Sequence, residues 1–381
     1  MINSRKFLLL ITLYICVWFS ALGQRSPQVP LKTDSLKAKH KNSFLVAPLI
    51  GTSVETNWQF GFASAFIFKT NRSDSTLRTS TIPLGFLYTL NQQILVNFGA
   101  NIYFPKEKYF FRMDNSYSKY PEFFWGIGND KTNSGKYELY TFSQYSISPQ
   151  VHRSIVKHVF AGLGLEHQRV YDIFYHGTGI EPSLFVKDNV RGVIDRSFYM
   201  INGASFYLSY DSRNNAYAPD KGIYFRLKFS EFSRFTYSDY VFSFLDADGR
   251  VFIKLFPKHI LGFNYVSLFN FGDVPYRNFA QLGSSFIMRG YYQGRFRDRN
   301  FIGGQTEYRF PIFWKFGGVV FVGTGQVFGN FLDYTNDKLK ISVGTGIRFE
   351  LLPKEKLNLR FDVGWGNNNQ FNYYLTVGES F

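Results

Sequence analysis

The chain has 381 residues, which is enough for one large domain or two ordinary ones. Phe, Tyr and Trp make up 20% of it, which favours β-strands, and the single cysteine, Cys16, excludes a disulfide framework and a thiolate metal site. The formal net charge of +15 is compatible with nucleic acid as a partner. The mean hydropathy of −0.16 fits a soluble protein, and it also fits a membrane β-barrel, in which lipid-facing and lumen-facing residues alternate.

Residues 1–23 predict a secretory signal peptide. Arg5 and Lys6 precede the short apolar run FLLLITLYICVWFSALG, which ends in a small-x-small cleavage pattern. An uncleaved membrane anchor is the less favoured alternative, because the run is short for a helical span. We therefore expect export and cleavage near Gln24. Nucleic acid is then out of reach, and outer-membrane lipid, lipopolysaccharide phosphates or acidic groups inside a lumen are the expected counter-charges, with a solvated basic surface as the alternative.

Residues 24–43 predict a flexible periplasmic tail, since they are polar, contain proline and are rich in lysine. The tail is too short for a folded accessory domain. From about residue 44 onward the pattern changes to an alternation with period two, which predicts β-strands.

The alternation places one apolar face and one polar face on each predicted strand. In residues 222–230, Ile223, Phe225 and Leu227 alternate with polar residues, and residues 340–351 and 357–365 repeat the pattern. A soluble β-sandwich would show the same alternation with its apolar face inward. The signal peptide and the strand count favour a transmembrane antiparallel β-barrel over residues 44–381, an all-β fold.

Turn signals divide this region into about sixteen strands. We expect short periplasmic turns near Asn91-Gln92, near Tyr120-Pro121, at Val151–Ser154, at Asn215–Asp220, at Pro257-Lys258, at Pro311–Lys315 and at Pro353–Lys356. We expect longer outer loops near 70–76, 104–108, 129–136, 172–197, 232–238, 272–299, 330–338 and 367–370. Seven turns and eight loops give an even number of strands, with both ends of the barrel chain on the periplasmic side.

The last residues, NYYLTVGESF, predict a final lipid-facing strand. Tyr373, Leu375, Val377 and Phe381 share one parity, and Glu379 interrupts the apolar register. A terminal Phe is also the usual ending by which the outer-membrane insertion machinery recognises its clients. An incidental terminal Phe is the alternative.

The stretch LSYDSRNNAYAPDKGIYF, residues 208–225, predicts a strand–turn–strand unit. Pro219 and Gly222 shape the turn, and Asp211 and Arg213 lie on one face of the strand, where they can pair. The spacing of these residues with Asn214 resembles a pattern of the BamA/TamA family of outer-membrane barrels, also called bacterial surface antigen barrels.

Two further stretches carry the same resemblance. Arg289, Gly290 and Tyr291 in IMRGYYQGRFRDRN match the family's Arg-Gly-Phe/Tyr signature, and Glu307 and Arg309 in GGQTEYRFPI match the Glu-x-Arg of its next strand. The resemblance implies that the long outer loop folds into the lumen and that its arginine pairs with acids on the wall. Since Glu307 and Arg309 share the face opposite Tyr308, we expect both in the lumen, with Glu307 as the partner of Arg289.

The chain departs from the family pattern at two points. The following strand carries FVGTG, in which Gly323 stands where the family usually has an aspartate that also holds the loop arginine. We therefore expect one acidic partner to be missing, so that Arg289 relies on Glu307 or the loop is held more loosely. POTRA modules, which capture clients in the family, are not recognised before the barrel, which points to a borrowed partner subunit, few clients or a lost activity.

The sequence contains no motif that indicates an enzyme active site. The six histidines show no His-x-x-x-His or His-x-His spacing, and no serine lies in a Gly-x-Ser-x-Gly frame, so we expect no metal, no cofactor and no catalytic residue. The family resemblance implies insertion, assembly or translocation of proteins at the outer membrane, with client outer-membrane proteins or a periplasmic subunit as partners and no nucleic acid. The alternative is a passive pore or structural barrel, and a lipase is a third reading.

Overall fold

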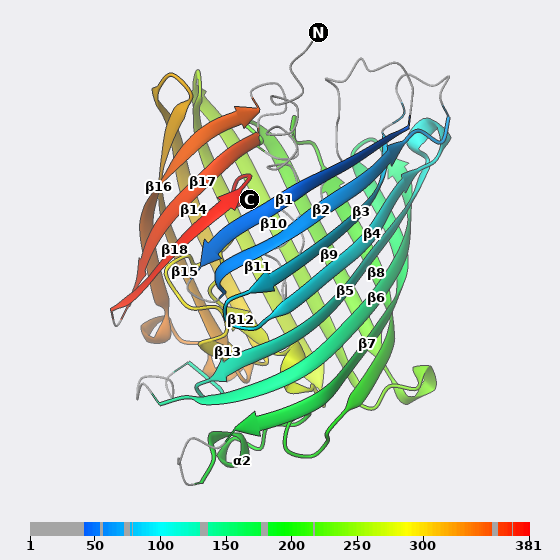
Figure 1. Ribbon diagram of the computed structural model, residues 1–381, viewed down its shortest axis with the longest axis vertical. Helices are drawn as coiled ribbons and strands as arrows, with labels where there is room; N and C mark the ends of the chain where they lie inside the picture. Colours follow the sequence, from blue (N-terminus) through cyan, green and yellow to red (C-terminus); the bar gives the residue numbers. More distant parts are fainter. Residues whose placement is uncertain are drawn as a thin grey trace.

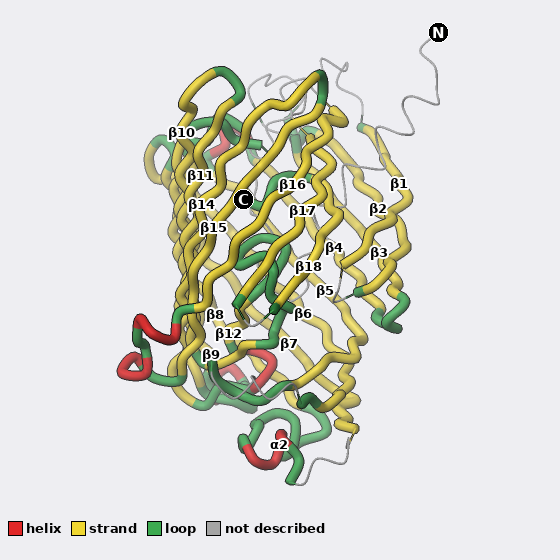
Figure 2. Tube along the Cα trace, turned by 90° about the vertical axis from the view of Figure 1, so that its left-hand side faces the viewer, coloured by secondary structure: helices red, strands yellow, loops and turns green. Residues whose placement is uncertain are grey.

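The computed structural model describes residues 42–53, 56–71, 77, 79–129, 136–176, 182–215, 218–352, 357–367 and 369–381. These residues form one closed antiparallel barrel of sixteen strands, which confirms the predicted fold class and strand number (Figures 1 and 2). The predicted signal peptide and most of the predicted tail lie outside the described residues. In that part of the chain that the structure describes, no helix has the length and apolar character needed to cross a membrane.

The barrel strands follow chain order, except that a two-stranded hairpin, β12 and β13, stands apart from the wall. The strands are β1 (Ser43–Ser53), β2 (Asn57–Phe68), β3 (Ser80–Thr89), β4 (Ile94–Tyr103), β5 (Tyr109–Phe124), β6 (Glu138–Val156), β7 (Val159–His176), β8 (Tyr199–Asp211), β9 (Gly222–Phe232), β10 (Phe242–Phe256), β11 (His259–Gly272), β12 (Ala280–Leu282), β13 (Phe296–Asp298), β14 (Asn300–Phe313), β15 (Phe316–Phe328), β16 (Lys340–Leu352), β17 (Leu357–Gly366) and β18 (Gln370–Val377). The helices are short: α2 (Leu184–Lys187), η2 (Pro105–Glu107), η4 (Arg234–Thr236), η5 (Tyr276–Asn278), η6 (Phe331–Asp333) and η7 (Asn336–Lys338).

The connections fall into two sets at opposite ends of the barrel. We call the end with residues 104–108, 157–158, 257–258 and 314–315 the turn end, and the end with residues 182–198 and 273–299 the loop end. Figure 1 shows the turn end at the top and α2 at the bottom. The strand order requires seven connections at the turn end and eight at the loop end, as the sequence predicts.

Several individual connections were predicted wrongly. The link between β3 and β4, near Asn91, lies at the loop end, whereas residues 104–108 and the link between β2 and β3 lie at the turn end. No turn exists at Tyr120-Pro121, which lies within β5, and Val151–Ser154 lies within β6. Pro121 is tolerated there because β4 pairs with β5 only up to Lys119, so that β5 has a single ladder neighbour at Pro121.

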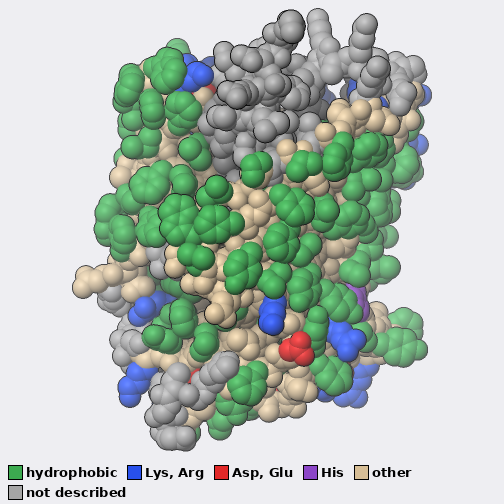
Figure 3. Space-filling view, in the orientation of Figure 1, with side chains coloured by type: hydrophobic (Ala, Val, Ile, Leu, Met, Phe, Trp, Pro, Cys, Tyr) green, Lys and Arg blue, Asp and Glu red, His purple; other side chains and the backbone are tan. Residues whose placement is uncertain are grey.

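The wall has an apolar outside and a polar inside. On β9, Ile223, Phe225 and Phe229 are exposed, whereas Tyr224 and Arg226 are buried toward the lumen. Figure 3 shows the same arrangement as a broad apolar field over the visible strands. A soluble sandwich would bury that apolar face, so the predicted alternation is confirmed in the form that suits a lipid-facing barrel.

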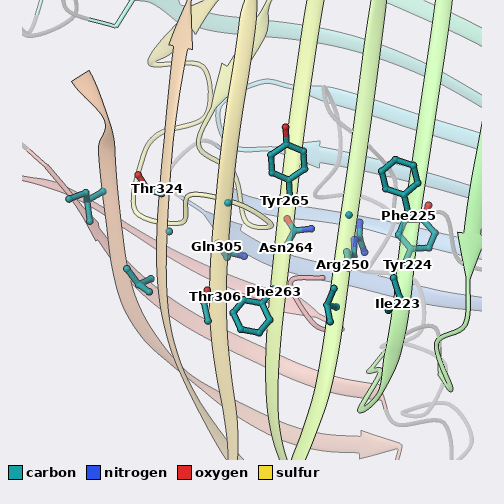
Figure 4. A pocket seen from close by; sticks show the side chains of 16 residues that line it. Ile223, Tyr224, Phe225, Arg250, Phe263, Asn264, Tyr265, Gln305, Thr306 and Thr324 are labelled. Carbon is teal, nitrogen blue, oxygen red and sulfur yellow. The ribbon is translucent and has the colours of Figure 1, made fainter. Parts of the chain in front are cut away.

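The outer wall also carries a shallow hollow of about 690 Å³ across β9–β16. Gly249 and Gly304 are among its lining residues and pair with Tyr265 from either side. Figure 4 labels Tyr265 and other residues that line the hollow. A Cβ added at Gly249 would lie 3.8 Å from Phe225 and one at Gly304 would lie 3.5 Å from the Asn264 carbonyl oxygen, which are ordinary contact distances. The hollow therefore exists because side chains are missing there, and no crowding of the wall requires these glycines.

The barrel closes through an unusually short ladder between its first and last strands. β1 pairs with β18 only at Thr52↔Leu375 and Ser53↔Tyr374, whereas each other neighbouring pair shares at least six positions. Continuing this register would place Gly378 opposite Leu49. The chain leaves the wall there, because Gly378 has φ +90° and its N–H donates to the Asn358 carbonyl oxygen at 2.7 Å.

Candidate functional site

The loop between β11 and β14, residues 273–299, folds into the lumen. Its side chains Ile287, Met288, Tyr291 and Phe296 are buried, and they pack with wall residues such as Phe301 in one apolar cluster. The hairpin of β12 and β13 lies within the outline of the strands in both views (Figures 1 and 2). The loop therefore occupies the lumen as the family signature implies.

Arg289 stands at the centre of this loop and is fully buried. Its guanidinium forms ion pairs with two carboxylates, that of Glu307 on β14 and, at 2.5 Å, that of Asp362 on β17. The Arg289 Cζ atom also lies 3.5 Å from the centroid of the Phe321 ring. Two carboxylates and a ring face thus offset the cost of removing this charge from water.

Asp362 corrects the expectation that one acidic partner is missing. Gly323 does lack a carboxylate, but the second acid comes from β17 instead of β15. A Cβ at Gly323 would lie 3.3 Å from the Met288 sulfur, so the loop fills the place where a side chain on β15 would stand. The loop is therefore held by two acids.

Two glycines allow the loop backbone to touch the wall. A Cβ on Gly290 would lie 2.8 Å from backbone atoms of Gly364 and Trp365, and a Cβ on Gly364 would lie 2.7 Å from the backbone of Arg289. Gly290 also has φ +115°, a conformation that favours glycine. Since no side chain fits between the two segments, the Arg-Gly pair fixes the height at which the loop crosses β17.

Tyr291 anchors the loop on the other side of the crossing. It is fully buried, its hydroxyl donates to the Ile341 carbonyl oxygen at 2.7 Å, and the Asn367 N–H donates to that hydroxyl at 2.8 Å. A Cβ at Gly366 would lie 2.4 Å from the Tyr291 ring. Tyr291 and Phe296 therefore pack inside the barrel, in the same apolar cluster.

The site extends from Arg289 into a larger charge network. Arg309 pairs with Glu307 at 2.7 Å, and Arg348 pairs with Asp362 and, at 2.9 Å, with Glu379. The network comprises four guanidinium groups and three side-chain carboxylates: Arg289, Arg309, Arg348, Arg360, Glu307, Asp362 and Glu379. All seven side chains are buried, so each depends on its neighbours for its hydrogen bonds.

Segment 378–381 contributes to this network from inside the barrel, which corrects the placement of Phe381. Phe381 is 5% exposed, its ring lies 5.8 Å from that of Phe252, and its carbonyl oxygen accepts a hydrogen bond from Arg309 at 3.0 Å. Ser380 donates to Glu307 at 2.8 Å. Phe381 therefore faces the lumen and not lipid, because the turn at Gly378 redirects the chain inward.

The other predicted residues of the last strand behave differently. Tyr373 and Leu375 occupy the outward parity of β18, opposite the buried Asn372 and Tyr374. The interruption at Glu379 has a physical cause, since its carboxylate accepts from Arg348 and from Asn358, the latter at 2.7 Å. A charge at that position was the sequence signal for an inward segment.

A second ionic anchor holds the loop near the loop end. Arg277 and Arg297, both in the loop, pair with one carboxylate, that of Glu122 on β5. Burial works against the charge of Arg297, but the Glu122 carboxylate outweighs it and raises the pKa of that guanidinium. Sequence reasoning missed Glu122, because its partners are more than 150 residues away.

Apolar side chains fill the lumen next to this anchor. Phe185 from α2 stacks on Phe124 at 4.2 Å between ring centroids, and Tyr276 meets Phe124 edge-on at 5.2 Å. The cluster comprises Phe124, Tyr140, Phe142, Val170, Phe185, Val190, Val193, Tyr199, Ile201, Phe232, Tyr240, Phe242, Val274 and Tyr276. The loop end of the lumen is therefore packed with side chains from the wall and from three loops.

The structure brings the residues of the turn motif together at the turn end. Arg213 pairs with Asp211 through two hydrogen bonds of 2.9 Å, and its Cζ atom lies 4.3 Å from the Tyr224 ring centroid. Gly222 has φ +111°, and Pro219 lies in the connection between β8 and β9. This motif lies on other strands than the Arg289 network, so the two sets make separate clusters.

The remaining residues that sequence reasoning missed are Asp362, Arg348 and Arg360. All three lie on the polar parity of predicted strands, which is the only signal that could have placed them in the lumen. Among the described residues, no group of three or more His, Cys, Asp or Glu side chains is arranged to hold a metal ion. The arrangement suits mechanical bracing of a loop by buried charges.

The sequence and the fold both resemble those of known proteins. Residues 55–381 match the family model described as the Omp85 superfamily domain. The fold is similar to that of BamA from Haemophilus ducreyi lacking POTRA domains 1-3, with a TM-score of 0.63, 13% identity, and coverage of 88% of this chain and 70% of that one.

Two further solved structures share the fold. CdiB from Acinetobacter baumannii has a TM-score of 0.59 and 12% identity, and the match covers 88% of this chain and 59% of that one. CdiB from Escherichia coli has a TM-score of 0.58 and 9% identity, and the match covers 86% of this chain and 61% of that one. The chain thus spans about three fifths of the CdiB chains. No curated protein matches it. The matched domain, the sixteen-strand barrel and the Arg289 loop together show that the chain belongs to the Omp85 superfamily.

Proposed function

We propose that this barrel inserts or translocates other proteins at the outer membrane through the seam between β1 and β18. The observation that carries the proposal is the ladder of two residue pairs at this seam. Residues 44–51 of β1 pair with β2, and β2 is their only ladder neighbour in the described part of the chain. Such an edge can accept a client strand by β-augmentation, in which main-chain hydrogen bonds extend the sheet.

The physical reason is the cost of unmade hydrogen bonds in lipid. Backbone N–H and C=O groups facing hydrocarbon without a partner are costly, which favours pairing of β1 with any strand that presents its own edge. Segment 378–381 does not serve this purpose, because it is held in the lumen by Arg309, Arg348 and Glu307. The Arg289 network, on β14 and β17, braces the wall beside the seam.

The alternative is a passive pore or structural barrel. A loop that lacked its second acid at Gly323 would favour this alternative, but Arg289 also pairs with Asp362. The packing of the loop end and the presence of loop 273–299 in the lumen also support a role other than open diffusion. The short seam is the feature that a purely structural barrel does not need.

A reversible lock on the seam tests the proposal. Thr52 and Leu375 lie directly opposite each other across the seam, and Cys16 in the predicted signal peptide is the only native cysteine. The pair Thr52→Cys and Leu375→Cys should form a disulfide under oxidation, and the abundance of other outer-membrane barrels should then fall in a quantitative proteome and recover on reduction.

The matched control places the same bond away from the seam. Thr306 and Val322 face each other on β14 and β15, so Thr306→Cys with Val322→Cys should cross-link without changing the proteome. If the locked seam leaves every other outer-membrane protein at its normal abundance, the assembly function is wrong and the structural barrel is favoured.

A further inference from the structure

The outer wall of β5–β7 carries a polar patch at its loop-end part. Tyr117, Tyr145 and Arg169 lie directly opposite one another on β5, β6 and β7. On the next outward-facing rung toward the loop end, Ser143 of β6 lies between Lys119 of β5 and Tyr171 of β7. His167 completes the patch one rung toward the turn end, with its ring centroid 5.4 Å from that of Tyr145. We call Tyr117, Lys119, Tyr145, His167, Arg169 and Tyr171 the tyrosine–cation patch.

The patch borders the apolar part of the same wall. Toward the turn end, the outward residues of β6 and β7 are apolar and exposed, including Ile147, Leu163 and Leu165, the last of which is 64% exposed. Figure 3 shows the same change, with basic side chains appearing below the apolar field of the visible face. A step from apolar to tyrosine-rich and basic residues marks the level of lipid headgroups, where amphipathic rings and cations are favoured.

The two cations of the patch are available for an anion. Lys119 and Arg169 are exposed and form no ion pair with a carboxylate of the described residues. Arg169 lies near two aromatic rings, with its Cζ atom 6.0 Å from the centroid of Tyr171 and 5.8 Å from that of Phe198. By contrast, the exposed loop arginine Arg196 is paired with Asp239 at 3.0 Å.

One carboxylate adjoins the patch. Asp172 follows Tyr171 in the chain and is exposed, so it reduces the positive charge that an approaching anion meets. His167 is committed to a hydrogen bond of 2.6 Å between its Nδ1 atom and the Asn202 side-chain oxygen. The patch therefore offers two cations, three tyrosines and one opposing carboxylate.

We propose that the tyrosine–cation patch binds the phosphorylated headgroup of an outer-leaflet lipid. Lys119 and Arg169 contact the phosphate groups, since ammonium and guanidinium groups are the preferred phosphate donors. The tyrosines contact the body of the headgroup, and the acyl chains lie along Ile147, Leu163 and Leu165. The inference concerns the outer surface of β5–β7, which is remote in the strand order from the β1–β18 seam, and it does not rest on the proposed function.

Binding of a phosphorylated lipid to the full-length barrel in detergent tests the proposal. The probes are lipid A with both phosphates and the same lipid after enzymatic dephosphorylation, with Kd measured by titration in native mass spectrometry. The wild-type protein should prefer the phosphorylated form. Lys119→Gln and Arg169→Gln should each weaken its binding about fivefold, and the double variant about thirtyfold.

Two further variants separate a built patch from general charge attraction. Lys157→Gln with Lys258→Gln removes two exposed lysines from the turn end and should leave Kd unchanged. Asp172→Asn should tighten binding of the phosphorylated lipid. Equal affinity for the two lipids, an equal loss in the Lys157 and Lys258 control, or weaker binding of Asp172→Asn would each overturn the proposal. Circular dichroism and heat-modifiable gel mobility verify that all variants are folded.

Discussion

Asp362→Asn is the sharpest test of the buried network, because it keeps the shape of the side chain and removes one charge. In the wild type, the Asp362 carboxylate faces Arg289 at 2.5 Å, Arg360 at 3.5 Å and Arg348. After the change, four guanidinium groups share the carboxylates of Glu307 and Glu379 alone. The variant thus leaves the same buried positive charge with one carboxylate fewer to offset it.

The expected loss of stability follows from burial. Both partners of the Arg289–Asp362 pair are fully buried, and removing one partner of a buried pair costs about 3–5 kcal/mol. The loss should be smaller when Arg289 is already absent. A double-mutant cycle of Asp362→Asn with Arg289→Gln should therefore give a coupling of about 0.5–3 kcal/mol, as should Glu307→Gln with Arg289→Gln.

The assay is the urea midpoint of the folded barrel in detergent, followed by tryptophan fluorescence and by the gel mobility of unheated samples. Asp172→Asn, at an exposed carboxylate, is the control and should change the midpoint little. Gly323→Asp should not rescue Asp362→Asn, because a Cβ at Gly323 already lies 3.3 Å from the Met288 sulfur. Rescue by Gly323→Asp, or an Asp362→Asn midpoint equal to that of the control, would refute the reasoning.

The other predictions use the same urea midpoint. Gly364→Ala should destabilise the barrel by about 1–3 kcal/mol, because its Cβ would lie 2.7 Å from the loop backbone. Gly249→Ala should stabilise the barrel by about 0.5–1 kcal/mol, because its Cβ would meet only ordinary contacts. Equal effects of the two variants would contradict the account of both glycines. Tyr291→Phe should cost about 0.5–1.5 kcal/mol by removing the hydrogen bonds that join its hydroxyl to the Ile341 carbonyl oxygen and the Asn367 N–H, and an unchanged midpoint would argue against that anchor. Glu379→Gln should weaken the hold of Arg348 on segment 378–381 and make the seam more sensitive to protease; unchanged cleavage would speak against that role.

The sequence was sufficient for the architecture because alternation is a local property. The parity of Ile223, Phe225 and Leu227 follows from the pleat of one strand and needs no knowledge of its neighbours. The pairing of Arg289 with Glu307 was also within reach, since both lie in recognisable motifs 18 residues apart. Individual turns failed where polar runs inside long strands resembled turns, as at Tyr120 in β5.

The tertiary structure alone decided which distant groups meet. Asp362 lies 73 residues from Arg289, and only the closed strand order and the height of the loop crossing at Gly364 bring their side chains together. The inward course of Phe381 likewise depends on Arg309 and on the turn at Gly378, which no alternation rule contains. Period-two patterning therefore determined which face of each strand points into the lumen. Register, barrel closure and the balance of buried charges determined which side chains meet there.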